Sequence, residues 1–135
     1  MFLEKELCHR IIGCLFAVHN KYGPGHREVI YDRALKEEFE SADLPFTQKP
    51  RIHLYSVTSG KKIGEFVPDY LVDGKVLVEI KALPHVKATE GERQMLEYLK
   101  ISEFEIGYVV NFSERTLRPK RFIHTKDRKR FLPNL

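Results

Sequence analysis

Two short stretches of the sequence combine residue types that could bind a metal ion and act on a phosphate. Pro68-Asp69 lies ten residues before Glu79-Ile80-Lys81, which ends an apolar run that starts at Val76. Residues two apart on a strand point to the same side, so Glu79 and Lys81 share a face. Burying such charges costs several kcal/mol, roughly, unless they are paired or bind a metal. The two charges therefore require a partner.

A divalent cation would satisfy these residues. Two carboxylates held together repel each other and favour a cation between them. Asp69 and Glu79, with Glu28 as a third acid, would form a hard oxygen-ligand site suited to Mg²⁺ or Mn²⁺. Lys81 could orient or help deprotonate a water, or stabilise charge on a phosphate. The alternative is a structural ion pair of Lys81 with Glu79 or Asp69, and the spacing alone leaves both interpretations open.

The turn at Asp73-Gly74 decides whether the two carboxylates can meet. A two-residue loop would put Asp69 opposite Val78, with its carboxylate on the face away from Glu79. A three-residue loop, Val72-Asp73-Gly74, would put Asp69 opposite Leu77, one diagonal step from Glu79 on the same face. A break at Pro68 could also redirect Asp69. The metal hypothesis therefore predicts an odd-length loop or a bulge.

The elements that must position these residues follow from the apolar periodicity. Gly23-Pro24-Gly25 ends a first helix, and Thr89 with Glu92 has the spacing of a capping box that starts a third. The pattern predicts helices over about residues 3–21, 26–41 and from 89 onward, and strands near residues 46–55, 63–71, 76–81, 106–112 and 121–124. This order predicts an α/β fold, a mixed four- to five-stranded sheet flanked by helices, in one domain spanning residues 1–135.

Charge is unevenly distributed along the chain. Residues 115–135 hold eight Lys or Arg residues and one Asp, which leaves 15 basic against 18 acidic residues in the remainder. Such a basic C-terminal tail would attract a polyanion. A solvated, solubilising terminus is the alternative.

The two cysteines and the hydropathy bear on the cellular setting. Cys8 and Cys14 are six residues apart on a predicted helix, where they point in different directions and cannot bridge each other. This usage favours a reducing, cytoplasmic setting. The sequence has no apolar run approaching 18 residues, so we expect no membrane partner.

A series of motifs between about residues 10 and 112 points to a known family. Gly25, Glu28 and Tyr31 reproduce a G-x-x-E-x-x-Y signature, and they are followed in order by Gln48-Lys49-Pro50, Asp69, Glu79-Ile80-Lys81-Ala82, Gln94-Met95-Leu96-Glu97-Tyr98-Leu99 and Asn111-Phe112. The chain thereby resembles the GxxExxY proteins, which are placed in the PD-(D/E)xK nuclease superfamily. Members of that superfamily cut phosphodiesters with Mg²⁺ on a restriction-endonuclease-like α-β-β-β-α-β core, to which this chain adds an N-terminal helix.

The resemblance also implies roles for individual residues. Asp69 and Glu79 would be metal ligands, the backbone carbonyl of Ile80 a further ligand, and Lys81 the catalytic lysine. Glu28 would be the helix carboxylate that supports the metal, often through water.

Gln94 and Tyr98 match a Q-x-x-x-Y motif, and being four apart they share one helix face that could look toward the site. Gly91 stands where many relatives carry a histidine, which puts a substrate contact in doubt.

Three functions from different classes remain open at this stage. The first is a Mg²⁺- or Mn²⁺-dependent nuclease, with DNA favoured over RNA as the substrate. The second is a nucleic-acid-binding module that kept the fold and lost turnover. The third is an interaction protein in which the polar cluster is a structural ion-pair network. The sequence leaves the oligomeric state open, a homodimer included.

Overall fold

The computed structural model describes residues 2–84 and 89–131. Within them, helices cover both faces of a five-stranded sheet. In chain order the elements are α1 (Lys5–Tyr22), α2 (Glu28–Ser41), β1 (Phe46–Gln48), β2 (Ile52–Tyr55), β3 (Lys62–Phe66), β4 (Tyr70–Val72), β5 (Val76–Lys81), α3 (Thr89–Lys100), β6 (Ile106–Asn111), β7 (Lys120–Ile123) and a 3-10 turn, η1 (Lys126–Arg128).

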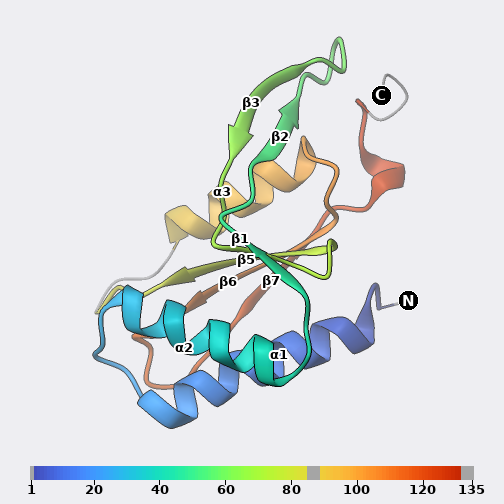
Figure 1. Cartoon of the computed structure of the whole chain (residues 1–135). Helices are drawn as coiled ribbons and strands as arrows, with labels where there is room; N and C mark the ends of the chain where they lie inside the picture. Colours follow the sequence, from blue (N-terminus) through green and yellow to red (C-terminus); the bar gives the residue numbers. More distant parts are fainter. Residues whose placement is uncertain (1, 85–88, 132–135) are drawn as a thin grey trace.

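The sheet is mixed, as the sequence predicts. Its strand order is β1-β4-β5-β6-β7, and a separate two-stranded sheet is formed by β2 and β3. The central pair β5–β6 is parallel, whereas β1–β4, β4–β5 and β6–β7 are antiparallel. Helix α3 makes the crossover between the two parallel strands. In Figure 1 the sheet is seen nearly edge on, with α1 and α2 below it and α3 and the β2–β3 hairpin above it.

The strands predicted near residues 46–55 and over residues 63–71 are each wrong as a single element. In the first, β1 belongs to the main sheet and β2 to the hairpin. β3 ends at Phe66 and belongs to the hairpin, whereas β4 begins at Tyr70 and belongs to the main sheet. Pro68 lies between them, and a proline has no N–H to donate to a continuous ladder. The chain therefore leaves one sheet and enters the other just before Asp69.

The turn between β4 and β5 has the odd length that the metal hypothesis requires. Val72 pairs with Val76, so the loop is Asp73-Gly74-Lys75. This confirms an odd loop, although the loop predicted to start at Val72 is wrong by one residue. Asp73 and Gly74 both have positive φ, 52° and 65°, and the Lys75 N–H donates to the Val72 carbonyl at 3.0 Å. Lys75 is the additional residue that shifts the pairing.

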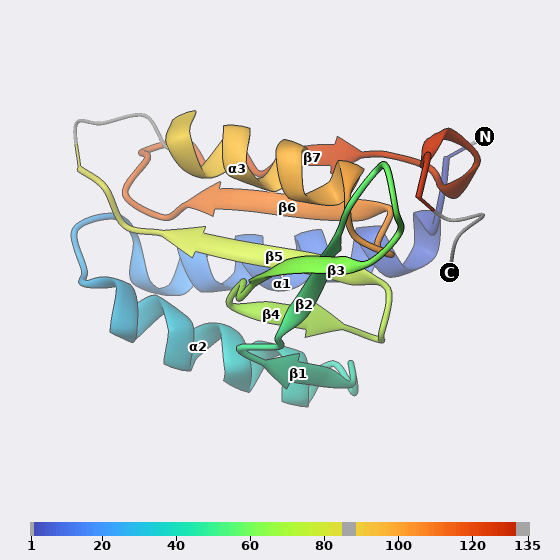
Figure 2. The ribbon, with the colours of Figure 1, turned by 90° about the horizontal axis from the view of Figure 1, so that it is seen from above.

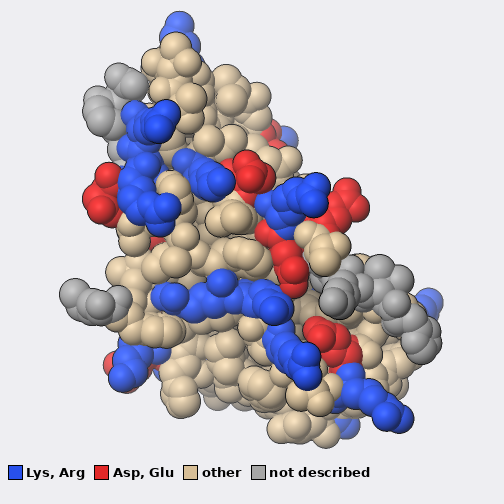
Figure 3. Space-filling model, turned by 180° about the vertical axis from the view of Figure 1, so that it is seen from behind, with Lys and Arg blue, Asp and Glu red and all other residues tan. Residues whose placement is uncertain are grey.

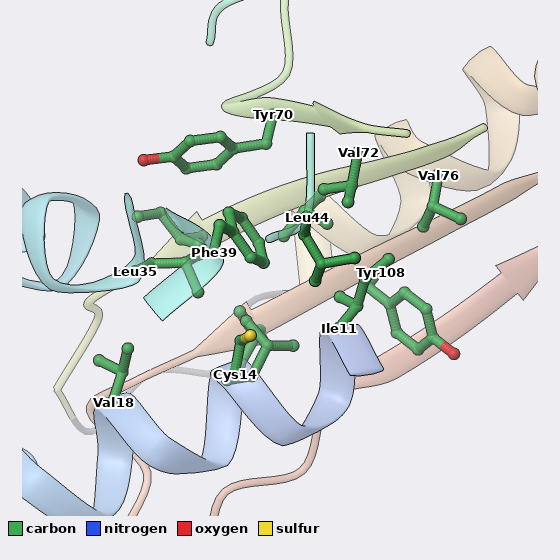
Figure 4. Packing of buried hydrophobic residues seen from close by; sticks show 14 of the residues in the cluster. Ile11, Cys14, Val18, Leu35, Phe39, Leu44, Tyr70, Val72, Val76 and Tyr108 are labelled. Carbon is green, nitrogen blue, oxygen red and sulfur yellow. The ribbon is translucent and has the colours of Figure 1, made fainter. Parts of the chain in front are cut away.

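The face of the sheet toward α1 and α2 is covered by one large apolar cluster. Alternate residues of β5, namely Val76, Val78 and Ile80, point into it. Figure 4 shows part of this packing, in which side chains of α1 and α2 lie against those of the strands. Residues shown there include Ile11, Cys14, Val18, Leu35, Phe39, Leu44, Tyr70, Val72, Val76 and Tyr108. Cys8 and Cys14 are both buried free thiols, in agreement with the prediction that they do not bridge.

The opposite face of the sheet carries a second, smaller cluster. Leu77 of β5 and Val109 of β6 pack there with Met95 and Leu99 of α3, and the hairpin adds Ile52, Leu54 and Phe66. Gly107 of β6 lets α3 come close, because a Cβ at that position would lie 2.3 Å from the Met95 sulfur. The register places Glu79 and Lys81 on this same face.

The predicted basic tail, residues 115–135, is partly built into the fold. Lys120–Ile123 form the edge strand β7, and Phe131 is fully buried. Residues 132–135 of the tail lie outside the described residues. No helix in the described part of the chain is both long and apolar enough to span a membrane.

Candidate active site

Asp69 and Glu79 lie side by side across two neighbouring strands. Tyr70 pairs with Val78, so the next step of the antiparallel register brings Asp69 opposite Glu79. Directly opposed residues point to the same face with Cβ atoms about 4.5–5.5 Å apart. Both residues are buried, with exposed fractions of 7% and 8%. We refer to these two residues as the acid pair.

Backbone and side-chain donors hold Asp69 in place. Its Oδ2 accepts a hydrogen bond from the Ile80 N–H at 2.7 Å. Its Oδ1 forms an ion pair with the Nζ of Lys49, and its carbonyl accepts the Lys49 N–H at 2.9 Å. The buried carboxylate is therefore satisfied by donors from both adjacent strands.

The pKa values of the two carboxyls of the acid pair are shifted in opposite directions. Burial raises the pKa of Glu79 far above its usual range, and the hydrogen bond and charge of Asp69 raise it further. Burial alone would raise the pKa of Asp69, but hydrogen bonds from Glu79, Lys49 and the Ile80 N–H outweigh it and hold this pKa below its ordinary value. Two buried carboxyls held side by side mark a position at which a hard cation would be favoured. The oxygens of the acid pair thus fit Mg²⁺ or Mn²⁺.

Glu28 lies at the same end of the sheet but is not part of the acid pair. It is the exposed first residue of α2, and α2 and α3 both begin near the end of the sheet where β5 finishes (Figure 2). Partial desolvation and then the charge of Asp69 raise the pKa of Glu28, while Lys81 and Lys49 lower it. In residues 2–84 and 89–131, no three His, Cys, Asp or Glu side chains are grouped closely enough to hold a metal. A supporting role for Glu28 therefore stays a prediction, one that would act over a longer distance, as through water.

The family signature explains how Glu28 is positioned. Tyr31 is fully buried and stacks on Phe112 with ring centroids 4.8 Å apart. Its hydroxyl donates to the Gly23 carbonyl at 2.6 Å and accepts the His26 N–H at 3.1 Å. The tyrosine thus fixes the glycine-rich turn before α2, where Gly25 has a φ of 103°. Glu28 begins its helix directly after this fixed turn.

Lys81 ends β5 on the same face as Glu79. Its carbonyl accepts the Phe112 N–H at 2.9 Å. The segment after it is held by Asn111, whose side chain accepts the Leu83 N–H at 3.0 Å and donates to the Leu83 carbonyl at 3.1 Å. On the helix side, a Cβ at Gly91 would lie 3.0 Å from the Lys81 Cε. The lysine stem therefore lies directly under the first turn of α3.

Gln94, Tyr98 and Ile80 are the remaining residues predicted for the site. Gln94 is exposed on α3, one turn after Gly91 and on the same side of the helix. The Tyr98 ring packs on Phe66 of the hairpin, with centroids 4.7 Å apart. The Ile80 side chain lies in the α1/α2 cluster, and its N–H is bound by Asp69. Roles for Gln94, for the Tyr98 hydroxyl and for the Ile80 carbonyl stay predictions.

Sequence reasoning missed Lys49 as a site residue. Gln48-Lys49-Pro50 was noted only as part of the resemblance, because the pairing of β1 with β4 is not visible in the sequence. Once that pairing is known, Gln48 opposite Tyr70 puts Lys49 opposite Asp69. The signal available beforehand was a lysine at the end of a short strand beside a proline, which is weak.

Comparison with known proteins identifies the family of the chain. The family model described as PD-(D/E)XK nuclease superfamily matches residues 5–123. The chain therefore belongs to the PD-(D/E)XK nuclease superfamily. No curated protein and no solved structure matches it.

Proposed function

We propose that this protein is a metal-dependent nuclease that hydrolyses phosphodiester bonds of nucleic acid, DNA in preference to RNA. The observation that carries the proposal is the acid pair, two buried carboxyls opposite each other in the sheet, with Lys81 two residues after Glu79 on the same face. A purely structural role would not require two acids to be buried against each other, since that arrangement is costly without a cation.

In this proposal each residue of the site has a separate role. Asp69 and Glu79 bind the ion, and the Ile80 carbonyl adds a further oxygen. Bound Mg²⁺ or Mn²⁺ supplies positive charge that polarises the scissile phosphate and lowers the pKa of a nearby water. The Lys81 ammonium orients the attacking water and stabilises charge on the phosphate.

Residues on the two helices complete the site. Glu28 supports the ion through water. The charges of Asp69, Lys81 and Lys49 shift the pKa of its carboxyl, although Glu28 is not part of the acid pair. Gln94 and Tyr98 act from α3, where Gln94 positions the substrate and Tyr98 fixes the helix against the hairpin. We also assign the chain to the GxxExxY group, since Tyr31 and the turn it binds give the signature a structural role.

The surface charge supports a polyanionic substrate. Seen from behind, Lys and Arg side chains gather in bands across the face on which β7 lies (Figures 2 and 3). Arg118 and Lys120, in and beside β7, are exposed. Exposed cations of this kind bind nucleic-acid phosphates and make the binding sensitive to salt. In this proposal the whole chain acts as one domain in the cytoplasm, where the free thiols of Cys8 and Cys14 persist.

The test compares the parent protein with Glu79→Gln and Lys81→Met on single- and double-stranded DNA and on RNA, with Mg²⁺, Mn²⁺ or a chelator. Glutamine resembles a protonated glutamate in shape, so Glu79→Gln should fold. We expect each variant to lose at least about 100-fold in cleavage rate. Glu37→Gln, an exposed acid on α2, is the matched control and should cleave like the parent.

Three outcomes would contradict the proposal, each in a different way. Cleavage that survives in both variants would come from a contaminant. Salt-sensitive binding without any cleavage would identify a nucleic-acid-binding module. Neither binding nor cleavage, with no rise in melting temperature on adding metal, would leave a structural ion-pair network.

A further inference from the structure

Lys49, Asp69 and Glu79 form a row across three adjacent strands. Gln48 of β1 pairs with Tyr70 of β4, and Tyr70 pairs with Val78 of β5. One residue further along, Lys49 is opposite Asp69 and Asp69 is opposite Glu79. The lysine therefore approaches the acid pair from the β1 side of the sheet.

The backbone of Lys49 is held in an unusual conformation that keeps it there. Its φ is 49°, in the left-handed region that residues other than glycine rarely adopt. A proline follows at position 50, and the residue before a proline prefers an extended conformation. The Lys49 N–H nevertheless donates to the Asp69 carbonyl at 2.9 Å, and its Nζ pairs with Asp69 Oδ1. Unfavourable backbone angles persist where the surrounding contacts determine them, and they often occur at functional sites.

Both oxygens of Asp69 are occupied in this arrangement. Oδ2 accepts the Ile80 N–H from inside the sheet, and Oδ1 receives the Lys49 ammonium from the solvent side. A divalent ion bound between Asp69 and Glu79 would lie close to the Lys49 ammonium on Asp69 Oδ1. An ammonium and a divalent cation repel strongly at such short range. Contact of both cations with Asp69 would therefore cost free energy.

The lysine side chain is able to leave. It is 61% exposed, whereas the Asp69 side chain is only 10% exposed. The Lys49 amine can therefore move into water without unpacking either apolar cluster. Its backbone hydrogen bond to Asp69 does not depend on where the amine lies.

We propose that Lys49 is a positioning residue that acts as a tethered cation, holding the acid pair in the metal-free protein and giving way when a divalent ion binds. This inference rests on the proposed function, because it takes Asp69 and Glu79 as the metal ligands. Lys49 thereby lowers the affinity for metal while it stabilises the empty site.

The test measures Mn²⁺ binding by isothermal titration calorimetry and metal-free unfolding by urea. Lys49→Met removes the competing charge, so we expect about tenfold tighter Mn²⁺ binding together with lower stability of the metal-free protein. Lys49→Gln repeats the measurement with a neutral polar side chain, should the methionine variant fold poorly. Lys49→Arg keeps a cation and should bind Mn²⁺ with an affinity near that of the parent.

Lys62→Met is the matched control. Lys62 is an exposed lysine of the hairpin that pairs with Glu65, and its removal should leave Mn²⁺ affinity unchanged. A merely structural role for Lys49 would lower stability and metal affinity together, so opposite changes in the two are the decisive readout.

The outcomes separate this inference from the proposed function. If the parent binds Mn²⁺ and the neutral Lys49 variants bind it no more tightly, the inference is overturned. The nuclease proposal is then unaffected. Absence of Mn²⁺ binding in the parent and in all variants would overturn both.

Discussion

The two faces of β5 differ in kind although they belong to the same six residues. Val76, Val78 and Ile80 point into an apolar cluster that runs the length of the strand on the α1/α2 side. On the α3 side, Leu77 is apolar, whereas Glu79 and Lys81 carry charges. One face holds the strand in place and the other uses that fixed strand to present charged groups.

The apolar face makes the charged face tolerable. Ile80 is anchored in the α1/α2 cluster, and its N–H, fixed by that anchoring, is a donor to Asp69. A buried carboxylate needs such preset donors, because otherwise it would lose hydration without compensation. Packing on the opposite side of the sheet thus offsets the free energy that burying the acid pair costs.

The largest expected effect is a loss of stability when the apolar face is changed. Leu35 of α2 is fully buried in the α1/α2 cluster, so Leu35→Ala should lower the free energy of unfolding by about 2–5 kcal/mol. Glu79→Gln should change the metal-free value by less than about 1 kcal/mol, because the amide replaces a protonated carboxyl of the same shape. Urea unfolding in the presence of a chelator measures both.

The gain in stability on adding metal should rank the two variants the other way, with Leu35→Ala gaining more than Glu79→Gln. At an ion concentration of about 100 times the dissociation constant, the parent and Leu35→Ala should each gain about 2.7 kcal/mol, and Glu79→Gln should gain little. If Glu79→Gln is as damaging as Leu35→Ala without metal, the acid pair is a structural element and the contrast between the two faces fails.

The far end of the α3 face carries a second buried charge, Lys129. Its side chain is 4% exposed, and its Nζ donates to the carbonyls of Leu99 and Phe104, at the end of α3 and just beyond it. Burial lowers the pKa of Lys129 to about 8. A free lysine titrates near 10.4, so between these values the unfolded chain binds more protons than the folded one.

Stability should therefore rise with pH across this window. Between pH 7.5 and pH 9.5, Lys129 should add on the order of 2 kcal/mol to the free energy of unfolding. Lys129→Met lacks the titrating amine, so the difference between the two pH profiles reports on Lys129. A difference that does not change with pH would mean that the amine remains fully charged in the folded state.

Much of the fold is visible in the sequence because it depends on local pattern. The helices begin and end within a few residues of the predicted positions, and the Asp73-Gly74 turn is where the chain reverses. The continuous strands near residues 46–55 and over residues 63–71 were wrong because the two sheets cannot be told apart from alternation alone. Pro68 was a sign of the break, yet it could equally have marked an edge strand.

The site was predictable in part, for a related reason. Glu79 and Lys81 share a face by periodicity, and the turn length carries Asp69 to them. Lys49 was missed because its contact depends on β1 joining β4, a pairing between segments that no local pattern specifies. Lys129 was counted within a basic tail, and nothing nearby in the sequence reveals that its amine donates to the carbonyls of Leu99 and Phe104.

The smallest expected effect concerns Gly91, where stability and function should separate within one substitution. Gly91→Ala places a Cβ 3.0 Å from the Lys81 Cε, so the flexible lysine stem has to move by a few tenths of an ångström. Alanine favours a helix over glycine by up to about 1 kcal/mol, which offsets the crowding. The free energy of unfolding should therefore stay within about 1 kcal/mol of the parent. Cleavage should still fall several-fold, because small displacements of a catalytic group slow a reaction.

Gly13→Ala is the matched control for this substitution. Gly13 lies within α1, and a Cβ there meets no atom within 4 Å, so the helix gains the same propensity without touching Lys81. The control should match or exceed the parent in stability and cleave at the parental rate. If Gly91→Ala also cleaves at the parental rate, the exact position of Lys81 under α3 does not limit cleavage. The charge of Lys81 alone would then account for its role in the reaction.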